Sequence, residues 1–336
     1  MPRRPRTAFA MFPHLPDRFF GPAGLNRLQR IARLAPSPAL TDFTSPDADQ
    51  ILADTEVLIT GWGCPMIDAD VLSRAPQLRA VIHAAGTVKG RVTPACWERG
   101  VQVSTAASAN AEPVAEFTLA MLLLAGKAVL PIAREYATRR GPVNLGREFP
   151  AIGNYQRRIG LVGASRVGRR VIELLRPFAF DVWVSDPFLN PAQAQSLGVT
   201  LAALDQLLST CTIISLHAPS LPSTRHLIDR RRLSLLPDGA VLINTARGAL
   251  IDQDALTDEL VSGRLSAILD TTEPEITAPD SPLYTLPNVL LTPHLAGASG
   301  NELARLGQSA LAELARYARG LPFRHPVTLA DLERIA

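Results

Sequence analysis

Short apolar runs alternate with amphipathic helical patterns along most of the 336-residue chain. A first series contains the predicted strands TAFAMF, EVLITG, LRAVIHAAG and VQVSTA, with the helical stretches NRLQRIARLA and DADVLSRAP between them. Apolar runs of roughly four to eight residues that alternate with helices are typical of parallel strands covered on both faces. The pattern therefore predicts an α/β fold with a parallel sheet.

A second α/β series begins at Ile159, after two segments of different character. Residues 111–140 form one long helical pattern, which we expect to end or kink at Pro131. The polar segment 141–158 is rich in glycine and proline and predicts an exposed connector. Further strands are expected in RIGLVG, DVWVSD, TIISLHAP, AVLINTA and LSAILD, and a last amphipathic helix is expected over 301–320.

Composition and charge narrow the possible partners. Hydrophobic residues make up 47% of the chain, charged residues 19%, and the net charge is only +3. Lys89 and Lys127 are the only lysines, and the arginines are scattered without a block of like charge, so we expect no nucleic-acid partner. The cysteines Cys64, Cys96 and Cys211 form no CxxC pair, so neither a disulfide framework nor a metal site is expected.

The first residues, MPRRPRTAFAMFPHLP, place basic residues before apolar ones, as a signal peptide does. Pro13, His14 and Pro16 interrupt the apolar run, and a small-residue cleavage site is lacking, so a first strand is the better interpretation. No window approaches the roughly 20 apolar residues of a membrane span. We therefore expect a cytoplasmic protein without a membrane partner.

The stretch RIGLVGASRVGRRV (158–171) predicts a strand, a glycine loop and a helix. Gly163 permits a tight turn and Gly168 permits close packing of helix on strand, while the helix N-terminus presents N–H groups to a pyrophosphate. Ser165 stands where the usual dinucleotide fingerprint has its second glycine, and we expect it to be tolerated because its hydroxyl can donate to a phosphate oxygen. The predicted cofactor-binding residues of this loop are Gly163, Ser165, Arg166, Val167 and Gly168.

Two other interpretations of this region are weighed against a nucleotide site. A serine nucleophile would need glycine two residues after Ser165, where Val167 stands. Asp186 ends the next predicted strand, 18 residues beyond Gly168 (186 − 168). A carboxylate there accepts hydrogen bonds from ribose hydroxyls and repels a 2′-phosphate, which favours NAD over NADP. Taken alone, Asp186 could equally be a solvated aspartate at a strand end.

Three later segments carry the candidate chemistry: LINTARGALID (242–252), AILDTTEPEITAPDSPLY (267–284) and NVLLTPHLAGAS (288–299). With the glycine loop, and in this order and spacing, they resemble the D-isomer-specific 2-hydroxyacid dehydrogenase family from about Val57 to Gly320. NTARG and TPHLAG together are specific to that family, whereas either alone is modest support.

The resemblance implies an architecture and a cofactor. It predicts two Rossmann-like, doubly wound parallel-sheet domains, with an NAD-binding domain over 107–297 inserted into a flavodoxin-like substrate domain over 1–106 and 298–336. NAD is the implied cofactor, and substrate would lie in a cleft that closes before hydride transfer.

The resemblance also implies a catalytic set. Arg247 would bind the substrate carboxylate and the carbonyl oxygen, and His294 would act as the acid in reduction and the base in oxidation. Hydride addition to a ketone develops alkoxide charge, which an arginine and a proton donor relieve together. A carboxylate would support the charged imidazole, and we choose Glu275 over Glu273 because the family's glutamate lies five residues beyond the position of Asp270.

Further contacts follow from the same resemblance. In VIHAAGTVKG the backbone of Ala85, Gly86 and Thr87 would cradle the substrate carboxylate, although Val88 stands near a position where the family commonly has aspartate. Asp270 would hold the nicotinamide carboxamide. The remaining predicted cofactor contacts are His217, Pro219, Thr224, Thr245 and Ala246.

Each of these residues has a structural explanation when taken singly. His294 could be a satisfied loop histidine, Arg247 a surface ion-pair partner and Glu275 a solvated side chain. Their joint occurrence behind a nucleotide loop favours the functional interpretation. His83 and His226 lack any supporting pattern and are interpreted as structural.

The sequence thus predicts an NAD-dependent D-2-hydroxyacid dehydrogenase, acting on the CH–OH group of a small anionic acid. The resemblance also implies a homodimer, formed through the long helical segment that begins near Ala111 and the connector after it. We expect no regulatory domain after the closing helix. A formate dehydrogenase is disfavoured because it has glutamine where Glu275 stands. The alternative is an NAD(H)-sensing binding protein, similar to a corepressor. Lys89 and Arg91 could meet a second substrate anion, but solvation is the preferred interpretation.

Overall fold

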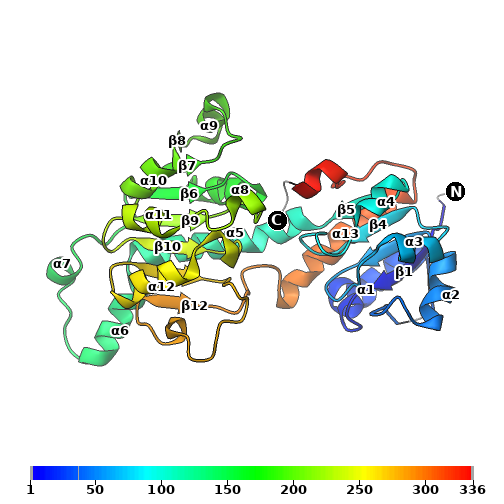
Figure 1. Ribbon diagram of the computed structural model, residues 1–336, viewed down its shortest axis with the longest axis horizontal. Coiled ribbons are helices and arrows are strands. Elements are labelled where there is room, and N and C mark those ends of the chain that lie inside the picture. Colours follow the sequence, from blue (N-terminus) through cyan, green and yellow to red (C-terminus); the bar gives the residue numbers. More distant parts are fainter. Residues whose placement is uncertain (1–2, 37, 334–336) are drawn as a thin grey trace. The chain divides into compact units, whose positions relative to one another are not determined.

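The computed structural model describes residues 3–36 and 38–333. The chain divides into two compact units, called unit 1 (Met1–Ala111 and Ala298–Ala336) and unit 2 (Glu112–Gly297) (Figure 1). The first boundary falls inside helix α5 (Ala107–Gly126), five residues after the expected one (111 − 106). Unit 2 is therefore an insertion in the sequence of unit 1.

Unit 1 is built on a five-stranded parallel sheet in the order β2-β1-β3-β4-β5. The strands are β1 (Arg6–Ala10), β2 (Arg33–Leu34), β3 (Val57–Thr60), β4 (Ala80–His83) and β5 (Gln102–Thr105). Successive residues of β3 enter opposite cores, Leu58 one and Ile59 the other. Because both faces of the sheet are apolar, helices must cover both. The helices are α1 (Leu15–Ile31), α2 (Pro46–Asp54), α3 (Ala69–Arg74), α4 (Pro94–Glu98), α13 (Leu303–Tyr317) and the start of α5.

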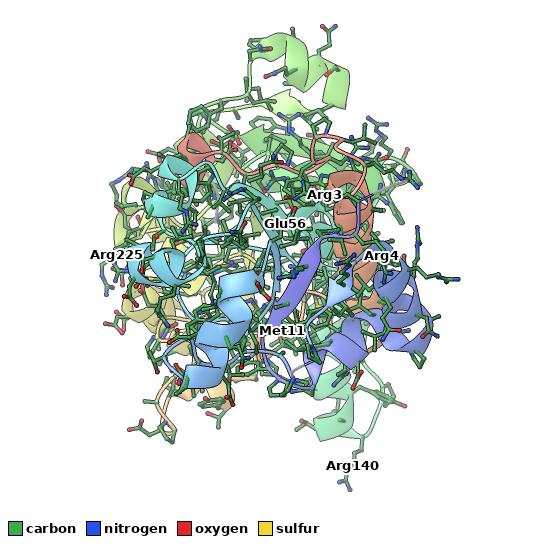
Figure 2. All side chains as sticks on the ribbon, turned by 90° about the vertical axis from the view of Figure 1, so that its right-hand side faces the viewer. Arg3, Arg4, Met11, Glu56, Arg140 and Arg225 are labelled. Carbon is green, nitrogen blue, oxygen red and sulfur yellow. The ribbon has the colours of Figure 1, made fainter. Side chains whose placement is uncertain are left out.

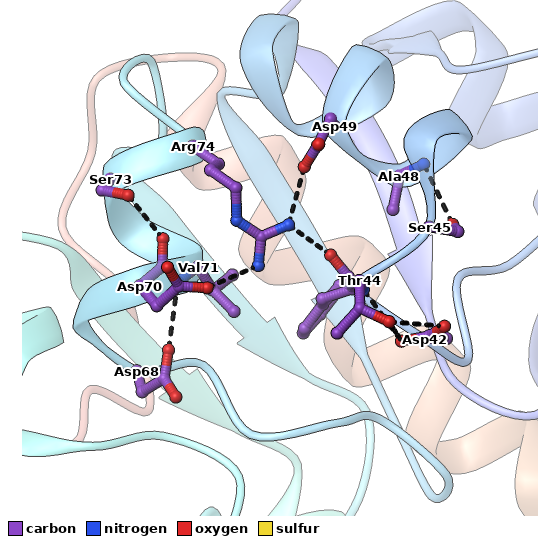
Figure 3. A network of polar contacts seen from close by, with 11 residues as sticks. Asp42, Thr44, Ser45, Ala48, Asp49, Asp68, Asp70, Val71, Ser73 and Arg74 are labelled. Atoms are coloured by element: carbon purple, nitrogen blue, oxygen red, sulfur yellow. Dashed lines mark hydrogen bonds and ion pairs between the residues drawn. The ribbon is translucent and has the colours of Figure 1, made fainter.

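Arg74, at the end of α3, connects two helices of unit 1 (Figure 3). Its guanidinium donates to Asp49 on α2 at 2.6 Å, to Asp70 at 2.9 Å and to the carbonyl of Phe43. Three acceptors arranged around one planar guanidinium fix its orientation. This contact ties α2 to α3 on the same face of the sheet.

The Glu56 carboxylate connects the first residues of unit 1 to helix α13. Figure 2 shows β1 running from Arg3 and Arg4 towards Met11. Arg3 donates to Glu56, which also accepts from Tyr317 of α13 at 2.7 Å, and burial beside that carboxylate raises the pKa of Tyr317.

Unit 2 contains a seven-stranded parallel sheet in the order β12-β11-β10-β9-β6-β7-β8. Its strands are β6 (Arg158–Val162), β7 (Asp181–Ser185), β8 (Thr200–Leu201), β9 (Ile213–Leu216), β10 (Val241–Asn244), β11 (Ser266–Leu269) and β12 (Val289–Leu291). Its helices, besides most of α5, are α6 (Val129–Arg139), α7 (Leu145–Glu148), α8 (Arg166–Leu175), α9 (Pro191–Leu197), α10 (Leu204–Thr210), α11 (Arg230–Leu235) and α12 (Gln253–Val261). The chain order reverses between β6 and β9, which is the switch point where ligands bind in such sheets. The predicted fold class, two doubly wound parallel-sheet α/β units, is confirmed.

Three local expectations differ from the structure. The long helical pattern breaks at Lys127 and Ala128, not at Pro131, which lies in the first turn of α6. A proline is tolerated there because its missing N–H has no partner within the helix. The connector also contains the short helix α7, and the strands β2, β8 and β12 have only two or three residues each, too few to form an apolar pattern.

None of the described helices is, on its own, both long and apolar enough to cross a bilayer. Taken together, α5 and α6 meet the length and composition requirement, but their axes are bent by 54° at the break between them.

Candidate active site

The glycine loop of unit 2 has the geometry of a phosphate cradle. Gly163 has a φ of 102°, and a Cβ on it would lie 2.7 Å from the Ala218 nitrogen. A Cβ on Gly168 would lie 2.2 Å from the Gly163 carbonyl oxygen. Both positions therefore require glycine, which brings helix α8 close to the end of β6.

Ser165 is the N-cap of α8. Its Oγ accepts from the Gly168 N–H at 3.4 Å, a long contact that satisfies one of the free donors of the helix start. The N–H groups of Ser165, Arg166 and Val167 meet no acceptor among the described residues. Three unpaired amides at a helix N-terminus attract an anion. The serine thus leaves the cradle available.

Asp186 follows β7 beside this loop. One carboxylate oxygen accepts from the Ala164 N–H at 2.6 Å, and the other accepts from the Phe188 N–H at 2.8 Å. The carboxylate therefore fixes the loop as well as placing a negative charge beside it. It remains half-exposed, with lone pairs available to a ligand.

The loop after β9 carries three predicted cofactor contacts. His217 is buried, with Nε2 3.0 Å from Ser215 Oγ and Nδ1 without a partner among the described residues. Burial lowers its pKa to about 4, so the ring is neutral. A cofactor contact would have to come from its backbone, because the ring is buried. Thr224 closes the loop by donating to the Pro219 carbonyl at 2.6 Å.

Arg247 lies in the loop after β10. Asn244 holds this loop, since its amide donates to the Arg247 carbonyl at 2.8 Å and accepts from the Ala246 N–H at 3.0 Å. Thr245 is buried, and its hydroxyl contacts Thr118 at 2.9 Å. Burial lowers the pKa of Arg247, and the Glu275 carboxylate opposes that shift. A partly desolvated guanidinium near Glu275 is available to bind an anion.

Asp270 is buried and organises the segment that carries His294. Its oxygens accept from Thr292 Oγ1 at 2.7 Å and from the N–H groups of Leu295 and Ala296 at 2.8 and 2.9 Å. Its carbonyl accepts from the His294 N–H at 2.9 Å. In this structure the Asp270 carboxylate thus holds the loop around His294 in place.

His294 and Glu275 form a hydrogen-bonded pair through Nδ1 and a carboxylate oxygen. His294 has a φ of 54°, a left-handed conformation that a histidine adopts only at some cost in energy. The bond to Glu275 occupies Nδ1 and leaves Nε2 for another partner. Both side chains are about half-exposed, at 45% and 56%, so a substrate can reach them.

Glu273 has a different environment. Its carboxylate accepts from Arg225 at 2.7 Å, and His226 lies 3.9 Å away. Thr272 sets the course of the chain between the two glutamates, donating to the Pro274 and Glu275 carbonyls at 2.8 and 3.0 Å. Thr272 belongs to the TTEPE motif, but nothing in the sequence indicated its role.

Unit 1 holds the predicted carboxylate cradle after β4. Thr105 Oγ1 donates to the carbonyls of Ala85, at 3.1 Å, and Gly86. The N–H groups of Ala85, Gly86 and Thr87 meet no acceptor within the described chain, so they are available to an anion. His83, interpreted as structural, is buried, and its Nδ1 lies 2.8 Å from Thr60 Oγ1. Burial lowers the pKa of His83 to about 4.

Gly248 explains how the loop that carries Arg247 meets the loop that carries Glu275. A Cβ on it would lie 2.1 Å from the Thr272 carbonyl carbon, so only glycine lets the NTARG loop lie against the TTEPE loop. Unit 2 thus combines a cradle of free amides at a sheet switch point with a histidine–carboxylate pair and a half-buried arginine.

Comparison with known proteins supplies the family. Residues 119–296 match the family described as "D-isomer specific 2-hydroxyacid dehydrogenase, NAD binding domain". The chain belongs to the D-isomer specific 2-hydroxyacid dehydrogenase family, and unit 2 contains its NAD-binding domain. The predicted family and cofactor are confirmed.

Relatives and solved structures are similar over most of the chain. The "D-3-phosphoglycerate dehydrogenase" of Mycobacterium tuberculosis is 35% identical over 283 residues, which cover 81% of this chain and 51% of that protein. The "Glyoxylate reductase" of Korarchaeum cryptofilum is 31% identical over 76% of this chain and 77% of its own. The TT0316 protein from Thermus thermophilus is 28% identical, with a TM-score of 0.76 over 96% of this chain and 100% of its own. This chain spans about half the length of the phosphoglycerate dehydrogenases that it matches.

Proposed function

We propose that this protein is an NAD(H)-dependent oxidoreductase of small 2-hydroxy and 2-oxo acids. The observation that carries the proposal is the Glu275–His294 hydrogen bond in the same unit as the free amides of the glycine loop. The half-buried guanidinium of Arg247 adds a site for the carboxylate and carbonyl oxygen of a 2-oxo acid.

The glycine loop fits the pyrophosphate of NAD, because a Cβ at Gly163 or Gly168 would clash with the backbone that forms the cradle. We assign Gly163, Ser165, Arg166, Val167 and Gly168 to the pyrophosphate and Asp186 to the ribose. The backbone of His217, Pro219 and Thr224 would line the adenine side, and Thr245, Ala246 and Asp270 the nicotinamide side. When bound, the reduced cofactor supplies the hydride.

Residues of this chain would stabilise the negative charge that develops on the carbonyl oxygen and would supply its proton. Arg247 would bind the substrate carboxylate and stabilise negative charge on the carbonyl oxygen. His294 would donate a proton to that oxygen from Nε2, and Glu275 would orient the ring and stabilise its charged form through Nδ1. The amides of Ala85, Gly86 and Thr87 would hold the carboxylate.

A matched pair of substitutions tests the assignment of Glu275. Glu275→Gln should lower kcat by about 100-fold or more, since it removes the charge that supports the imidazolium. Glu273→Gln is the control, because its carboxylate pairs with Arg225 and not with His294. Equal losses in both variants would contradict the assignment.

Turnover itself is tested with NADH and a panel of 2-oxo acids. We expect reduction of at least one member, with D-configured product. If NADH binds tightly and no acid is turned over, the oxidoreductase proposal fails and the NAD(H)-sensing alternative is favoured.

We further propose that the protein is a homodimer. The support is an apolar hollow of about 300 Å³ in unit 2, lined by residues of α5, α6 and the connector, among them Leu124, Leu130 and Phe149. A second copy that covers this hollow would remove the exposed apolar surface from water. Light scattering coupled to size exclusion should give the mass of two chains, and the mass of one chain would refute the dimer.

A further inference from the structure

We propose that the substrate carries a bulky apolar or aromatic side chain, received by an aromatic surface made of Phe12, Trp62 and Met66. This inference rests on the proposed function and names the substrate class for it. An apolar side chain distinguishes the proposed substrate from acids that carry a second anionic group.

Strand register brings this surface next to the predicted carboxylate cradle. The last residues of three adjacent strands are paired, Ala10 with Thr60 and Thr60 with His83. The N–H of Ala84 donates to the Thr60 carbonyl at 2.7 Å. Because adjacent strands lie about 4.8 Å apart, the segments after β1, β3 and β4 emerge side by side at one edge of the sheet.

The segments after β1 and β3 are also bonded to each other. The Phe12 N–H donates to the Trp62 carbonyl at 2.8 Å, and the Gly61 N–H donates to the Ala10 carbonyl at 3.1 Å. The backbone that carries these two aromatic side chains is thus held at the edge where the β4 turn presents its free amides.

The surface is exposed, and Trp62 is supported by the core behind it. Phe12 is 49% exposed, Trp62 37% and Met66 50%. The Trp62 ring packs on Phe19 with centroids 5.7 Å apart, and Phe19 itself is buried in the core. Large apolar side chains that are fixed from behind and open in front are typical of a ligand contact.

The two segments that carry this surface are themselves without charged side chains, which favours an apolar substrate side chain. Residues 11–16 and 61–67, which follow β1 and β3, contain no lysine, arginine, aspartate or glutamate. A phosphate or carboxylate on these two segments would gain no cation from them, which is unfavourable. Arg91 lies on the neighbouring segment, where its carbonyl accepts from the Ile67 N–H at 2.7 Å. Lys89 and Arg91, in the segment after β4, are the cations that a phosphorylated substrate would use instead.

The experiment compares kcat/KM with NADH for phenylpyruvate, glyoxylate and 3-phosphohydroxypyruvate. We expect phenylpyruvate to be preferred over both others by at least about tenfold. Trp62→Ala should lower kcat/KM for phenylpyruvate by about tenfold or more and change that for glyoxylate by less than about threefold. Trp62→Phe, which keeps an aromatic ring, is the matched control and should retain the preference.

The other possible results refute either the aromatic inference or the proposed function. A wild-type preference for 3-phosphohydroxypyruvate, lost in Arg91→Ala, would refute the aromatic inference while leaving the oxidoreductase proposal intact. Unchanged selectivity in Trp62→Ala would also refute it. If no acid is turned over, the proposed function fails, and calorimetric binding of D-phenyllactate then decides the inference. Binding weakened about tenfold by Trp62→Ala supports the aromatic surface, and equal binding refutes it.

Discussion

Acid should destabilise unit 2 through His217. The ring is buried, and burial lowers its pKa from 6.5 to about 4. The unfolded chain therefore takes up the proton first as the pH falls. The contribution of His217 to folding is fully present above pH 6.5 and is lost between pH 6.5 and about 4. A shift of this size corresponds to about 3 kcal/mol in the free energy of unfolding, of which about 2 kcal/mol is lost between pH 7 and pH 5.

Urea unfolding at pH 7, 6 and 5 measures this loss by circular dichroism and tryptophan fluorescence. In a background that carries Trp62→Phe and Trp97→Phe, Trp183 in β7 is the remaining tryptophan and reports on unit 2. His217→Gln removes the titrating ring and keeps a partner for Ser215, so the unfolding free energy of unit 2 should become about 2 kcal/mol less sensitive to pH over this range. His83→Gln should do the same for unit 1, because the pKa of buried His83 is also lowered to about 4. An unchanged pH dependence in His217→Gln would refute the reasoning.

Three further predictions concern the cofactor loop. Ser165→Gly should change NADH affinity by no more than about tenfold, ~1.4 kcal/mol, because glycine is a tolerated N-cap; complete loss in a fluorescence titration would show that the hydroxyl is essential. Gly168→Ala should weaken NADH binding at least about tenfold and lower stability by 1–3 kcal/mol, roughly the cost of overpacking, because its Cβ would meet the Gly163 oxygen at 2.2 Å. Gly146→Ala is the control, since the nearest atom to its new Cβ would be Asn144 Oδ1 at 3.8 Å. A normal melting temperature for Gly168→Ala would contradict the predicted clash. Asp186→Asn keeps an acceptor for the loop but removes the charge, so the preference for NADH over NADPH should fall by about tenfold; an unchanged ratio of dissociation constants would exclude Asp186 as the discriminating residue.

The fold could be predicted because buried parallel strands are apolar on both faces. TIISLHAP and AVLINTA contain β9 and β10 for this reason. The two-residue strand β8 and the break before Pro131 escaped prediction, since the first depends on pairing with β7 and the second on backbone conformation at Ala128. Neither cause leaves a local pattern.

The site could be predicted in its residue types but not in its internal contacts. Counting from Asp270 favoured Glu275, and His294 Nδ1 is hydrogen-bonded to the Glu275 carboxylate; that this carboxylate supports catalysis stays a prediction. The function of Asp270 in holding the loop, the left-handed backbone of His294 and the aromatic surface around Trp62 depend on segments far apart in the sequence. Such long-range contacts cannot be read from spacing alone.

The central claim is that His294 supplies the proton in an NADH-dependent reduction. Rapid mixing of the enzyme–NADH complex with a 2-oxo acid, monitored by NADH absorbance in a single turnover, tests it directly in His294→Ala. We expect a rate lower by about 100-fold or more, together with an NADH dissociation constant within about threefold of the wild-type value. A near-normal single-turnover rate in that variant would contradict the claim.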